Sequence, residues 1–297
     1  MLKRTFFISN PYHLSIKNDQ IVLKCKETNK TSSSPIEDLG FLILDHQQIT
    51  FSQSVIQAMS ANNVAVIFCD KKHHPTAMTL SFEGNHVQTE IIRHQINLKK
   101  PESKKLWQQT IQSKIANQAA LLGKLGKEFR PMKVYKDNVK SGDTSNQESA
   151  AARFYWKNLF GKGKFKRSRS GEPPNNALNY GYAVLRAAVA RALVGSGLLP
   201  SLGIHHHNKY NAYCLADDIM EPYRPFVDEI VYDLFMEKEI CKELNKGIKA
   251  KLLGLLNVDV GFEKIRRPLM VGLSLTTSSL SKCISKHEKR ISYPKLI

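Results

Sequence analysis

Short apolar runs separated by polar turns dominate the first third of the chain. Residues 41–44 (FLIL) and 64–69 (VAVIFC) are no longer than six residues and rich in strand-favouring side chains, which predicts buried strands. The polar sequence KNDQ at 17–20 separates two further apolar stretches and indicates a β-hairpin. A short amphipathic helix is predicted within 52–61, and residues 78–92 are expected to hold another strand pair. Together these patterns predict a small sandwich or mixed sheet.

Helical spacing replaces this pattern in the rest of the chain. After a polar, proline-containing break at 98–103, apolar side chains from 106 to 122 recur every three or four positions, as on one face of a helix. An alanine-rich helix is predicted over 183–193. Helical patterns also fit 230–256 and 273–289.

These patterns predict an α+β multidomain protein. A β-sandwich-like N-terminal domain, residues 1–95, is expected to precede a larger all-α domain, residues 96–297. No apolar stretch approaches the roughly 18 residues of a membrane-spanning helix, and the apolar N-terminal segment is too short for a secretory signal. The five cysteines include no CxxC pair, so a zinc or dithiol site has little support. We expect a soluble cytoplasmic protein with reduced thiols.

A large positive charge is the most informative feature of the composition. The chain carries 44 Lys and Arg residues against 26 Asp and Glu, a formal net charge of +18. Such an excess repels itself unless a polyanion compensates it, and DNA, RNA and anionic membranes all qualify. Because no basic amphipathic anchor is present, nucleic acid is favoured over a membrane surface.

Two stretches concentrate the basic residues. Eleven basic residues face three acidic ones from 99 to 140, and seven face none from 153 to 169. Residues 162–171 (KGKFKRSRSG) are expected to form a basic loop that contacts phosphates and reads little sequence. A merely solvated loop is the alternative interpretation.

An acidic segment interrupts this basic background. Between Asp217 and Glu239, eight carboxylates are opposed only by Arg224 and Lys238. Local negative charge in a protein that holds a polyanion needs a reason. A divalent cation is one, because it prefers oxygen ligands and can bridge to a phosphate. Three consecutive histidines at 205–207, just upstream, offer imidazole ligands.

Helical spacing places the first carboxylates of this segment on one face. If residues 211–220 form a helix, Asp217 and Asp218 lie four and three positions before Glu221. Pro222 would end that helix directly after Glu221. Exposed histidines and a solvated acidic face are the ordinary alternatives.

Glu148 is a further candidate carboxylate with a structural alternative. It is the last residue of Ser145-Asn146-Gln147-Glu148, which precedes an apolar run. This pattern fits a capping box with Ser145 as the N-cap residue and Glu148 as the third residue of the helix. From the residues alone, capping is the favoured role.

Several segments, in their order along the chain, resemble the CRISPR-associated protein one family of adaptation integrases and endonucleases. Two of them carry the candidate ligands: ESAAARFY at 148–155 and GIHHHNKYNAYCLADDIMEPYRP at 203–225. SANNVAVIF at 60–68, WQQTIQSKIANQA at 107–119 and LNYGY at 178–182 are also similar to the family. The likeness covers nearly the whole chain and has the character of members that accompany single-effector, type II systems.

The resemblance implies a metal site and a set of partners. It carries the family's three metal positions, which are also its catalytic positions, onto Glu148, His206 and Glu221, with Asp218 beside them. It implies Mg²⁺ or Mn²⁺ as the cofactor. It further implies an N-terminal β-sandwich for dimerisation and DNA contact, a helical catalytic domain, a homodimer, and assembly with a second, small ferredoxin-like CRISPR adaptation protein. Many relatives lack a histidine where His205 stands.

The implied reaction is phosphoryl transfer on double-stranded DNA. The 3′-hydroxyl of a short duplex (the prespacer) would be joined to the edge of the CRISPR repeat, and hydrolysis would result if water replaced that hydroxyl. Two other functions stay open. A standalone metal-dependent nuclease on branched DNA would cleave without joining. A non-catalytic nucleic-acid-binding protein would bind DNA without metal.

Overall fold

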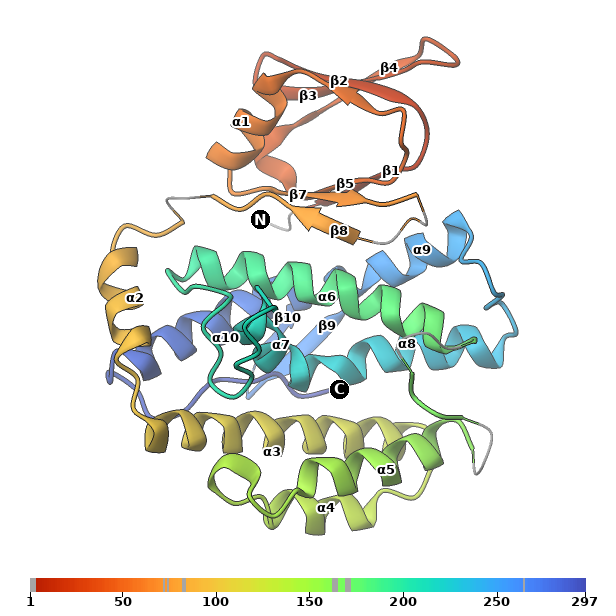
Figure 1. Ribbon diagram of the computed structural model, residues 1–297. Coiled ribbons are helices and arrows are strands. Elements are labelled where there is room, and N and C mark those ends of the chain that lie inside the picture. Colours follow the sequence, from red (N-terminus) through yellow and green to blue (C-terminus); the bar gives the residue numbers. More distant parts are fainter. Residues whose placement is uncertain are drawn as a thin grey trace. The chain divides into compact units, whose positions relative to one another are not determined.

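The computed structural model describes residues 4–71, 73, 75–81, 84–161, 165–168, 172–263 and 265–297. The chain divides into two compact units, Met1–Gly84 and Asn85–Ile297. Both helices and sheets build the protein, so the predicted α+β class is confirmed (Figure 1). Of the predicted basic loop at 162–171, only residues 165–168 are among the described residues.

The strands of the N-terminal unit form two sheets. They are β1 (Arg4–Ile8), β2 (Tyr12–Lys17), β3 (Gln20–Cys25), β4 (Thr31–Pro35), β5 (Leu39–Leu44), β6 (Thr50–Phe51), β7 (Ala65–Cys69) and β8 (Pro75–Met78). One sheet has the order β1-β5-β7-β8, with β1, β5 and β7 parallel and β8 antiparallel. The other has the order β4-β3-β2-β6 and is antiparallel except for the pair β2–β6. Leu14, Leu42 and Met59 are among the buried residues of a core that both sheets share with helix α1 (Gln53–Ala61).

Local signals explain the elements of this unit that the sequence predicts. Asn18 and Asp19 join β2 to β3 with positive φ angles of 50° and 55°, as in the tight turns that match the twist of a hairpin. Strand β5 is buried along its whole length, as its uninterrupted apolar run predicts. A short 3₁₀ helix, η1 (Ile36–Asp38), leads into β5.

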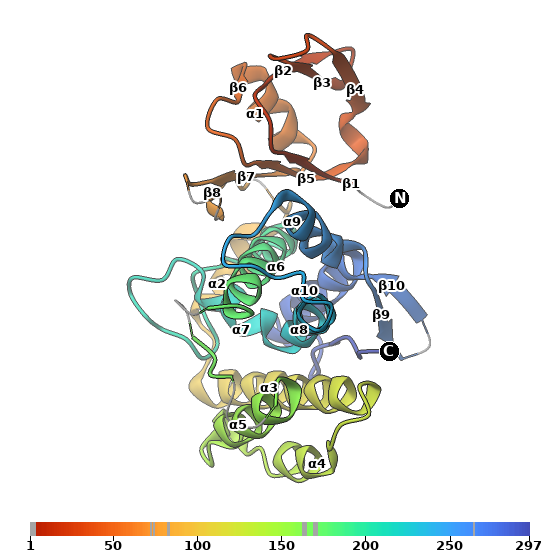
Figure 2. The ribbon, with the colours of Figure 1, turned by 90° about the vertical axis from the view of Figure 1, so that its right-hand side faces the viewer.

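Helices build most of the C-terminal unit (Figures 1 and 2). They are α2 (Gln88–Ile96), α3 (Lys100–Lys124), α4 (Arg130–Asp137), η2 (Ser141–Asp143), α5 (Gln147–Leu159), α6 (Asn175–Gly195), α7 (Cys214–Met220), η3 (Glu221–Tyr223), α8 (Arg224–Met236), α9 (Lys246–Leu253), η4 (Gly254–Asn257) and α10 (Leu269–Ile284). An antiparallel pair of strands, β9 (Asp259–Phe262) and β10 (Ile265–Pro268), precedes α10.

Helix α6 forms the buried scaffold of this unit. It packs against α7, α8, α9 and α10, and most of its residues are buried, as its alanine-rich sequence allows. Gly181 lets α6 approach α8 closely, because a Cβ atom at this position would lie 2.5 Å from Val227 Cγ1. Helix α3 packs against η3, α5 and α8, so it contacts the elements that carry the candidate carboxylates.

Three expectations from the sequence need correction. The strand pair expected at 78–92 is wrong, because β8 ends at Met78 and residues 88–96 form the amphipathic helix α2. The larger domain is not all-α, because it contains β9 and β10. The helix expected over 230–256 is interrupted, because α8 ends at Met236 and Lys238 takes a positive φ of 58°.

The boundary between the two compact units lies between Gly84 and Asn85, before the domain boundary expected at residue 95. Helix α2 belongs to the helical unit, because the Gln95 amide nitrogen donates to the carbonyl oxygens of Leu199 (3.0 Å) and Leu202 (2.9 Å). Among the described residues, no helix is both long enough and apolar enough to cross a membrane.

Candidate functional site

Two of the candidate carboxylates meet at one lysine. Lys114 Nζ on α3 lies 2.6 Å from Glu148 Oε1 on α5 and 2.6 Å from Glu221 Oε2 on η3. These carboxylate oxygens are therefore no more than twice that distance apart. The Glu221 side chain is buried, with 7% of it exposed, and the Glu148 side chain is 30% exposed. The two carboxylates therefore share Lys114 as a partner, one of them buried and the other partly exposed.

Glu148 lies in the first turn of α5, and the side chain that caps this turn is Asp143, not the predicted Ser145. Asp143 Oδ1 and Oδ2 accept hydrogen bonds from the backbone N–H groups of Gln147 and Glu148, each at 2.9 Å. Ser145 Oγ donates to the Asn138 carbonyl instead. The capping box predicted from Ser145 and Glu148 is therefore wrong. Because Asp143 satisfies the helix terminus, the Glu148 side chain is free to face Lys114.

Glu221 is placed where α7 gives way to η3, directly before Pro222. Arg224 Nε donates to its Oε1 at 2.8 Å, and Lys114 faces its Oε2. Burial raises the pKa of Glu221, but Arg224 and Lys114 together outweigh burial and lower it to about 2. Glu221 is therefore a buried carboxylate that stays charged at neutral pH.

Lys114 belongs to this cluster, although the sequence pattern does not single it out. It was counted among the basic residues of 99–140, whereas its side chain is only 11% exposed. Burial lowers the pKa of Lys114, but Glu221 and Glu148 outweigh burial and raise it above the ordinary value. A signal was available, because Trp107 and Ile111 precede Lys114 by seven and three positions and mark the buried face of this helix. A charged residue on a buried face indicates a role other than solvation.

A loop anchored on Asp218 places His206. The fully buried Asp218 carboxylate accepts hydrogen bonds from the backbone N–H groups of Ile204 (2.8 Å), His205 (2.9 Å) and His206 (3.3 Å). Its Oδ1 also lies 2.5 Å from His206 Nδ1. The hydrogen bond that His206 makes to Asp218 raises the pKa of His206. With a carboxylate oxygen as its partner, Nδ1 is the donor, so Nε2 carries the lone pair whenever the ring is neutral.

Close packing fixes this loop further. A Cβ atom on Gly203 would lie 2.2 Å from the His206 carbonyl oxygen and 2.9 Å from Asp218 Oδ2, so only glycine fits. The His205 ring stacks on Trp107 of α3, with centroids 4.1 Å apart and planes at 1°. The His206 ring meets Trp107 edge-on at 5.8 Å. Helix α3 therefore contacts both the histidine loop and the two glutamates.

The structure thus brings together two of the three predicted ligands and pairs the third with Asp218. Within the described residues, no group of three or more His, Cys, Asp or Glu side chains is arranged to hold a metal ion. The donor set still fits a hard divalent cation, since carboxylate oxygens and an imidazole are ligands of Mg²⁺ and Mn²⁺. Glu221 Oε2 also fits, because it is buried and already faces one cation, Lys114 Nζ, at 2.6 Å.

Four other carboxylates of the acidic segment make contacts elsewhere. Asp217 pairs with Arg186 (2.6 Å), Glu229 with Lys124 (2.7 Å) and Glu239 with Lys251 (2.6 Å). Asp228 is buried and accepts hydrogen bonds from Tyr155 Oη at 2.7 Å and from Tyr182 Oη. The expectation that this segment serves a cation therefore rests on Glu221, with Asp218 supporting His206.

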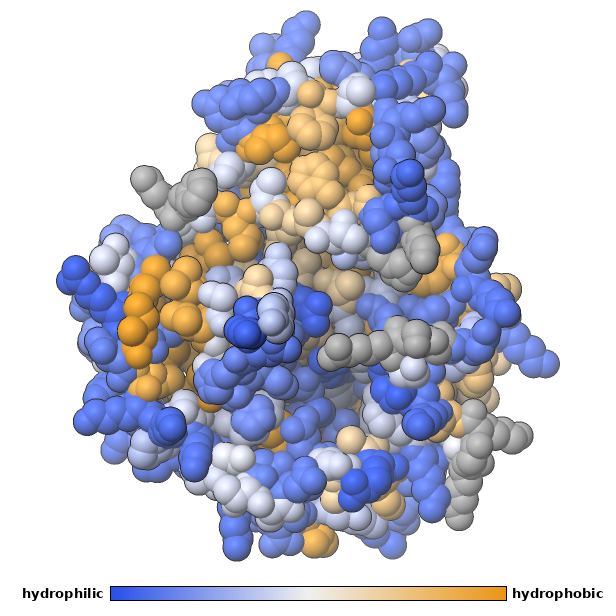
Figure 3. All heavy atoms as spheres, in the orientation of Figure 1, coloured by the Kyte–Doolittle hydropathy of each residue, from blue (hydrophilic) through white to orange (hydrophobic). Residues whose placement is uncertain are grey.

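A hollow lined by arginines borders the site. Its volume is 510 Å³, and Arg167, Arg186 and Arg224 line it together with Tyr182 and Asp217. Exposed basic side chains on α3, α4 and α5 include Lys104, Lys105, Lys133, Arg153 and Lys157. In the view of Figure 3, hydrophilic side chains cover most of these three helices.

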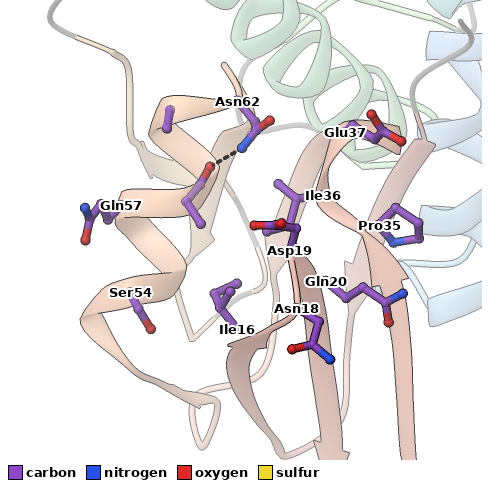
Figure 4. A pocket seen from close by; sticks show the side chains of 12 residues that line it. Ile16, Asn18, Asp19, Gln20, Pro35, Ile36, Glu37, Ser54, Gln57 and Asn62 are labelled. Atoms are coloured by element: carbon purple, nitrogen blue, oxygen red, sulfur yellow. Dashed lines mark hydrogen bonds between the residues drawn. The ribbon is translucent and has the colours of Figure 1, made fainter.

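A second hollow, in the N-terminal unit, has a different character. Its volume is 710 Å³, and it lies between the β2–β3 turn, η1 and α1 (Figure 4). Asp19 and Glu37 line it with neutral side chains such as Asn18 and Gln57, and no basic residue takes part. It therefore lacks the cations that a phosphate group requires.

Comparison with known proteins identifies the family. A model of the family described as "CRISPR associated protein Cas1" matches residues 6–252. The CRISPR-associated endonuclease Cas1 of Neisseria meningitidis serogroup C (strain 8013) is 32% identical over 300 residues, which cover 100% of this chain and 97% of that protein. The chain belongs to the Cas1 family.

Solved structures share this Cas1 fold. A casposase bound to its integration product superposes with a TM-score of 0.81 at 18% identity, covering 98% of this chain and 93% of that one. A Cas1 protein from Thermotoga maritima gives a TM-score of 0.78 at 15% identity, covering 95% and 97%. The family predicted from the sequence is confirmed, and with it the class of the protein as a Cas1-type endonuclease and integrase.

Proposed function

We propose that this Cas1-family protein joins the 3′-hydroxyl ends of short duplex DNA to a CRISPR repeat, with Glu148, His206 and Glu221 holding Mg²⁺ or Mn²⁺. The observation that carries the proposal is the convergence of Glu148 and Glu221, from different helices, on one cation at 2.6 Å each. Ligands of one divalent ion lie within about 5 Å of each other, because each bond to oxygen is ~2.0–2.6 Å long. The carboxylates satisfy this requirement.

Each side chain has a defined part in holding the site. Glu148 and Glu221 supply charged oxygens, and Arg224 fixes the rotation of the Glu221 carboxylate by holding its Oε1. Asp218 holds His206 Nδ1, which leaves Nε2 as the ligand atom. When bound, the divalent cation would polarise the scissile phosphodiester and stabilise the charge that develops in the transition state.

The proposed reaction is a transesterification that consumes no cofactor. A bond forms between the attacking 3′-oxygen and the phosphorus at the edge of the repeat, while the bond from that phosphorus to the leaving 3′-oxygen of the DNA that flanks the repeat breaks. The proton lost by the attacking hydroxyl is returned through solvent to the leaving oxygen. Water in place of the attacking hydroxyl would give hydrolysis, the endonuclease reaction of the same site.

The distribution of positive charge supports DNA as the substrate. Exposed lysines and arginines on α3, α4 and α5 provide non-specific contacts to phosphates. The arginine-lined hollow of 510 Å³ beside Glu221 offers guanidinium groups, which bind phosphate oxygens well. Binding through such contacts weakens steeply as salt is added.

We assign the two units different roles. The helical unit carries Glu148, His206 and Glu221 and is proposed as the catalytic domain, and the N-terminal unit is proposed as the sandwich-like domain for dimerisation and DNA contact. We also propose a homodimer that binds a small ferredoxin-like second adaptation protein. The second protein, though not the homodimer, is supported by a solved structure named Cas6-RT-Cas1–Cas2 complex, which superposes with a TM-score of 0.74 at 17% identity, covering 100% of this chain and 37% of that one.

A strand-transfer assay tests the proposal. Glu148→Gln, His206→Ala and Glu221→Gln are each expected to lower joining of a labelled prespacer to a repeat at least about a thousandfold, because each removes a ligand. Excess EDTA is expected to stop the wild-type reaction. Glu229→Gln is the matched control, since it removes a carboxylate that lies 2.7 Å from Lys124 Nζ, away from the site.

The products separate the competing functions. Full joining activity in any of the three variants would remove that residue from the ligand set, and undiminished joining in EDTA would refute the metal mechanism. Cleaved ends without joined strands would support the standalone nuclease. DNA binding without any product, and without dependence on metal, would support the non-catalytic alternative.

A further inference from the structure

The positive charge between Glu148 and Glu221 comes from a side chain of the protein, Lys114. Lys114 Nζ is 2.6 Å from an oxygen of each carboxylate, and these are two of the groups proposed to hold the divalent ion. An ammonium and a metal ion cannot occupy the position of Lys114 Nζ together, because both approach the same two oxygens and both are positively charged. The position of Lys114 therefore bears directly on how a metal binds.

The charges of the four groups cancel. Glu148 and Glu221 carry two negative charges, and Lys114 and Arg224 carry two positive charges. Placing a divalent cation among all four would leave a net charge of +2 in a mostly buried pocket. Such an excess is unfavourable unless a cation leaves the carboxylates or an anion joins them.

Lys114, rather than Arg224, is the cation that can leave. The Arg224 guanidinium is fixed twice, by Glu221 Oε1 and by the Tyr182 ring, whose centroid is 4.5 Å from its Cζ. Lys114 Nζ is held by one oxygen of each carboxylate, at 2.6 Å, and these are the same two groups that the metal ion is proposed to bind. A lysine also ends in a flexible four-carbon chain that can swing its charge to a new partner.

We propose that the Lys114 ammonium competes with the divalent cation for the position between Glu148 and Glu221, and that a DNA phosphate compensates it once it is displaced. This inference rests on the proposed function, which supplies the metal site. It makes Lys114 a positioning residue that keeps the carboxylate pair together and sets the affinity for metal. It also couples metal binding to DNA binding, because each ligand removes part of the penalty for the other.

Mn²⁺ binding to the EDTA-treated, dialysed full-length protein tests the competition without measuring activity. Electron paramagnetic resonance of free Mn²⁺, or calorimetry, gives the Kd. Lys114→Met is expected to tighten Mn²⁺ binding about tenfold or more, since removing an adjacent charge commonly shifts carboxylate equilibria by 1–3 log units. Lys114→Arg, which keeps the charge, is expected to stay within about threefold of wild type. Lys124→Met is the matched control on the same helix, because Lys124 Nζ also pairs with a carboxylate at 2.7 Å.

Added DNA tests the coupling. A short duplex is expected to tighten Mn²⁺ binding to the wild type by a larger factor than to Lys114→Met, because the variant has no ammonium to displace. Should Lys114→Met fail to fold, as judged by circular dichroism melting, Lys114→Gln takes its place, since it offers the carboxylates a neutral donor. The variant used is also expected to melt lower than wild type in the absence of metal.

The outcomes distinguish this inference from the proposed function. If the Kd for Mn²⁺ in the uncharged Lys114 variant is unchanged or higher than in wild type, the proposed competition is wrong. If Glu221→Gln loses Mn²⁺ binding in the same experiment, the proposed metal site still stands. The absence of saturable Mn²⁺ binding in wild type, with and without DNA, would overturn the proposed function and the competition with it.

Discussion

Glu221 and Asp228 are two buried carboxylates on adjacent helical segments, and they behave in opposite ways. Arg224 and Lys114 face Glu221, and although burial raises its pKa, these cations lower it to about 2. Two tyrosine hydroxyls face Asp228, and burial raises its pKa to about 6 although those hydrogen bonds and the charges of Arg224 and Arg167 lower it. Burial alone therefore does not decide the charge of a carboxylate. The charge of its partners does.

This difference separates a ligand site from a structural one. Neutral hydroxyls hold Asp228 in place but do not offset the loss of hydration, so its charge is disfavoured. The cations around Glu221 offset that loss, and one of them, Lys114, can be exchanged for another cation. Asp228 has no such exchangeable partner among the hydrogen bonds to Tyr155 and Tyr182.

The largest expected effect contrasts the two carboxylates in catalysis. Glu221→Gln is expected to lower DNA joining by about a thousandfold, because it removes a charged ligand. Asp228→Asn is expected to lower joining less than about tenfold, because it acts only through Tyr182 and Arg224. Strand-transfer rates with a labelled prespacer measure both. Equal losses in the two variants would contradict the separation drawn here.

The next effect is the pH dependence of stability due to Asp228. Its folded pKa of about 6 lies above its ordinary value of 3.8, so the folded protein holds a proton that the unfolded chain releases between these values. Stability therefore rises as pH falls through 6 and levels off below about 4, by on the order of 3 kcal/mol. Urea unfolding of wild type and Asp228→Asn from pH 7 to pH 4 measures it. The free energy of unfolding of wild type should rise relative to that of Asp228→Asn as the pH falls from 7 to 4. A difference that stays constant with pH would refute the raised pKa of Asp228.

A smaller effect distinguishes hydroxyls with charged and neutral partners. Tyr155→Phe removes a hydrogen bond to Asp228 and is expected to lower the free energy of unfolding at pH 7 by about 2 kcal/mol. Tyr223→Phe removes a hydrogen bond to Thr276 and is expected to lower it by about 1 kcal/mol. Denaturant melts measure both. At pH 4.5 the first loss should approach the second, because Asp228 is then mostly protonated.

The smallest effect concerns the turn that presents Glu148. Asp143→Ala is expected to lower the free energy of unfolding by about 1 kcal/mol, because two N–H groups at the start of α5 lose their acceptor. Ser145→Ala is the control and is expected to change it by less than about 0.5 kcal/mol. A larger loss for Ser145→Ala would restore the capping box that the sequence suggested.

Much of the architecture followed from local patterns. The hairpin at residues 17–20, strand β5 and the buried helix α6 each have a local cause, namely turn residues, an uninterrupted apolar run and alanine content. Errors arose where local patterns are ambiguous. The apolar residues of α2 were assigned to a strand, and β9–β10 were missed because two four-residue strands leave a weak pattern.

The candidate site, like the fold, could be predicted from the sequence only in part. From the sequence by itself, the resemblance of several segments to one family indicated both that family and the residues Glu148, His206 and Glu221, because segments of consecutive residues carry that information. Their assembly as metal ligands stays a prediction. Only the tertiary structure decided that Lys114 lies between the two glutamates, that Asp143 rather than Ser145 holds the first turn of α5, and which acids face cations. These contacts join residues from separate helices, and the spacing of residues along the sequence does not determine which of them lie close together in the folded protein.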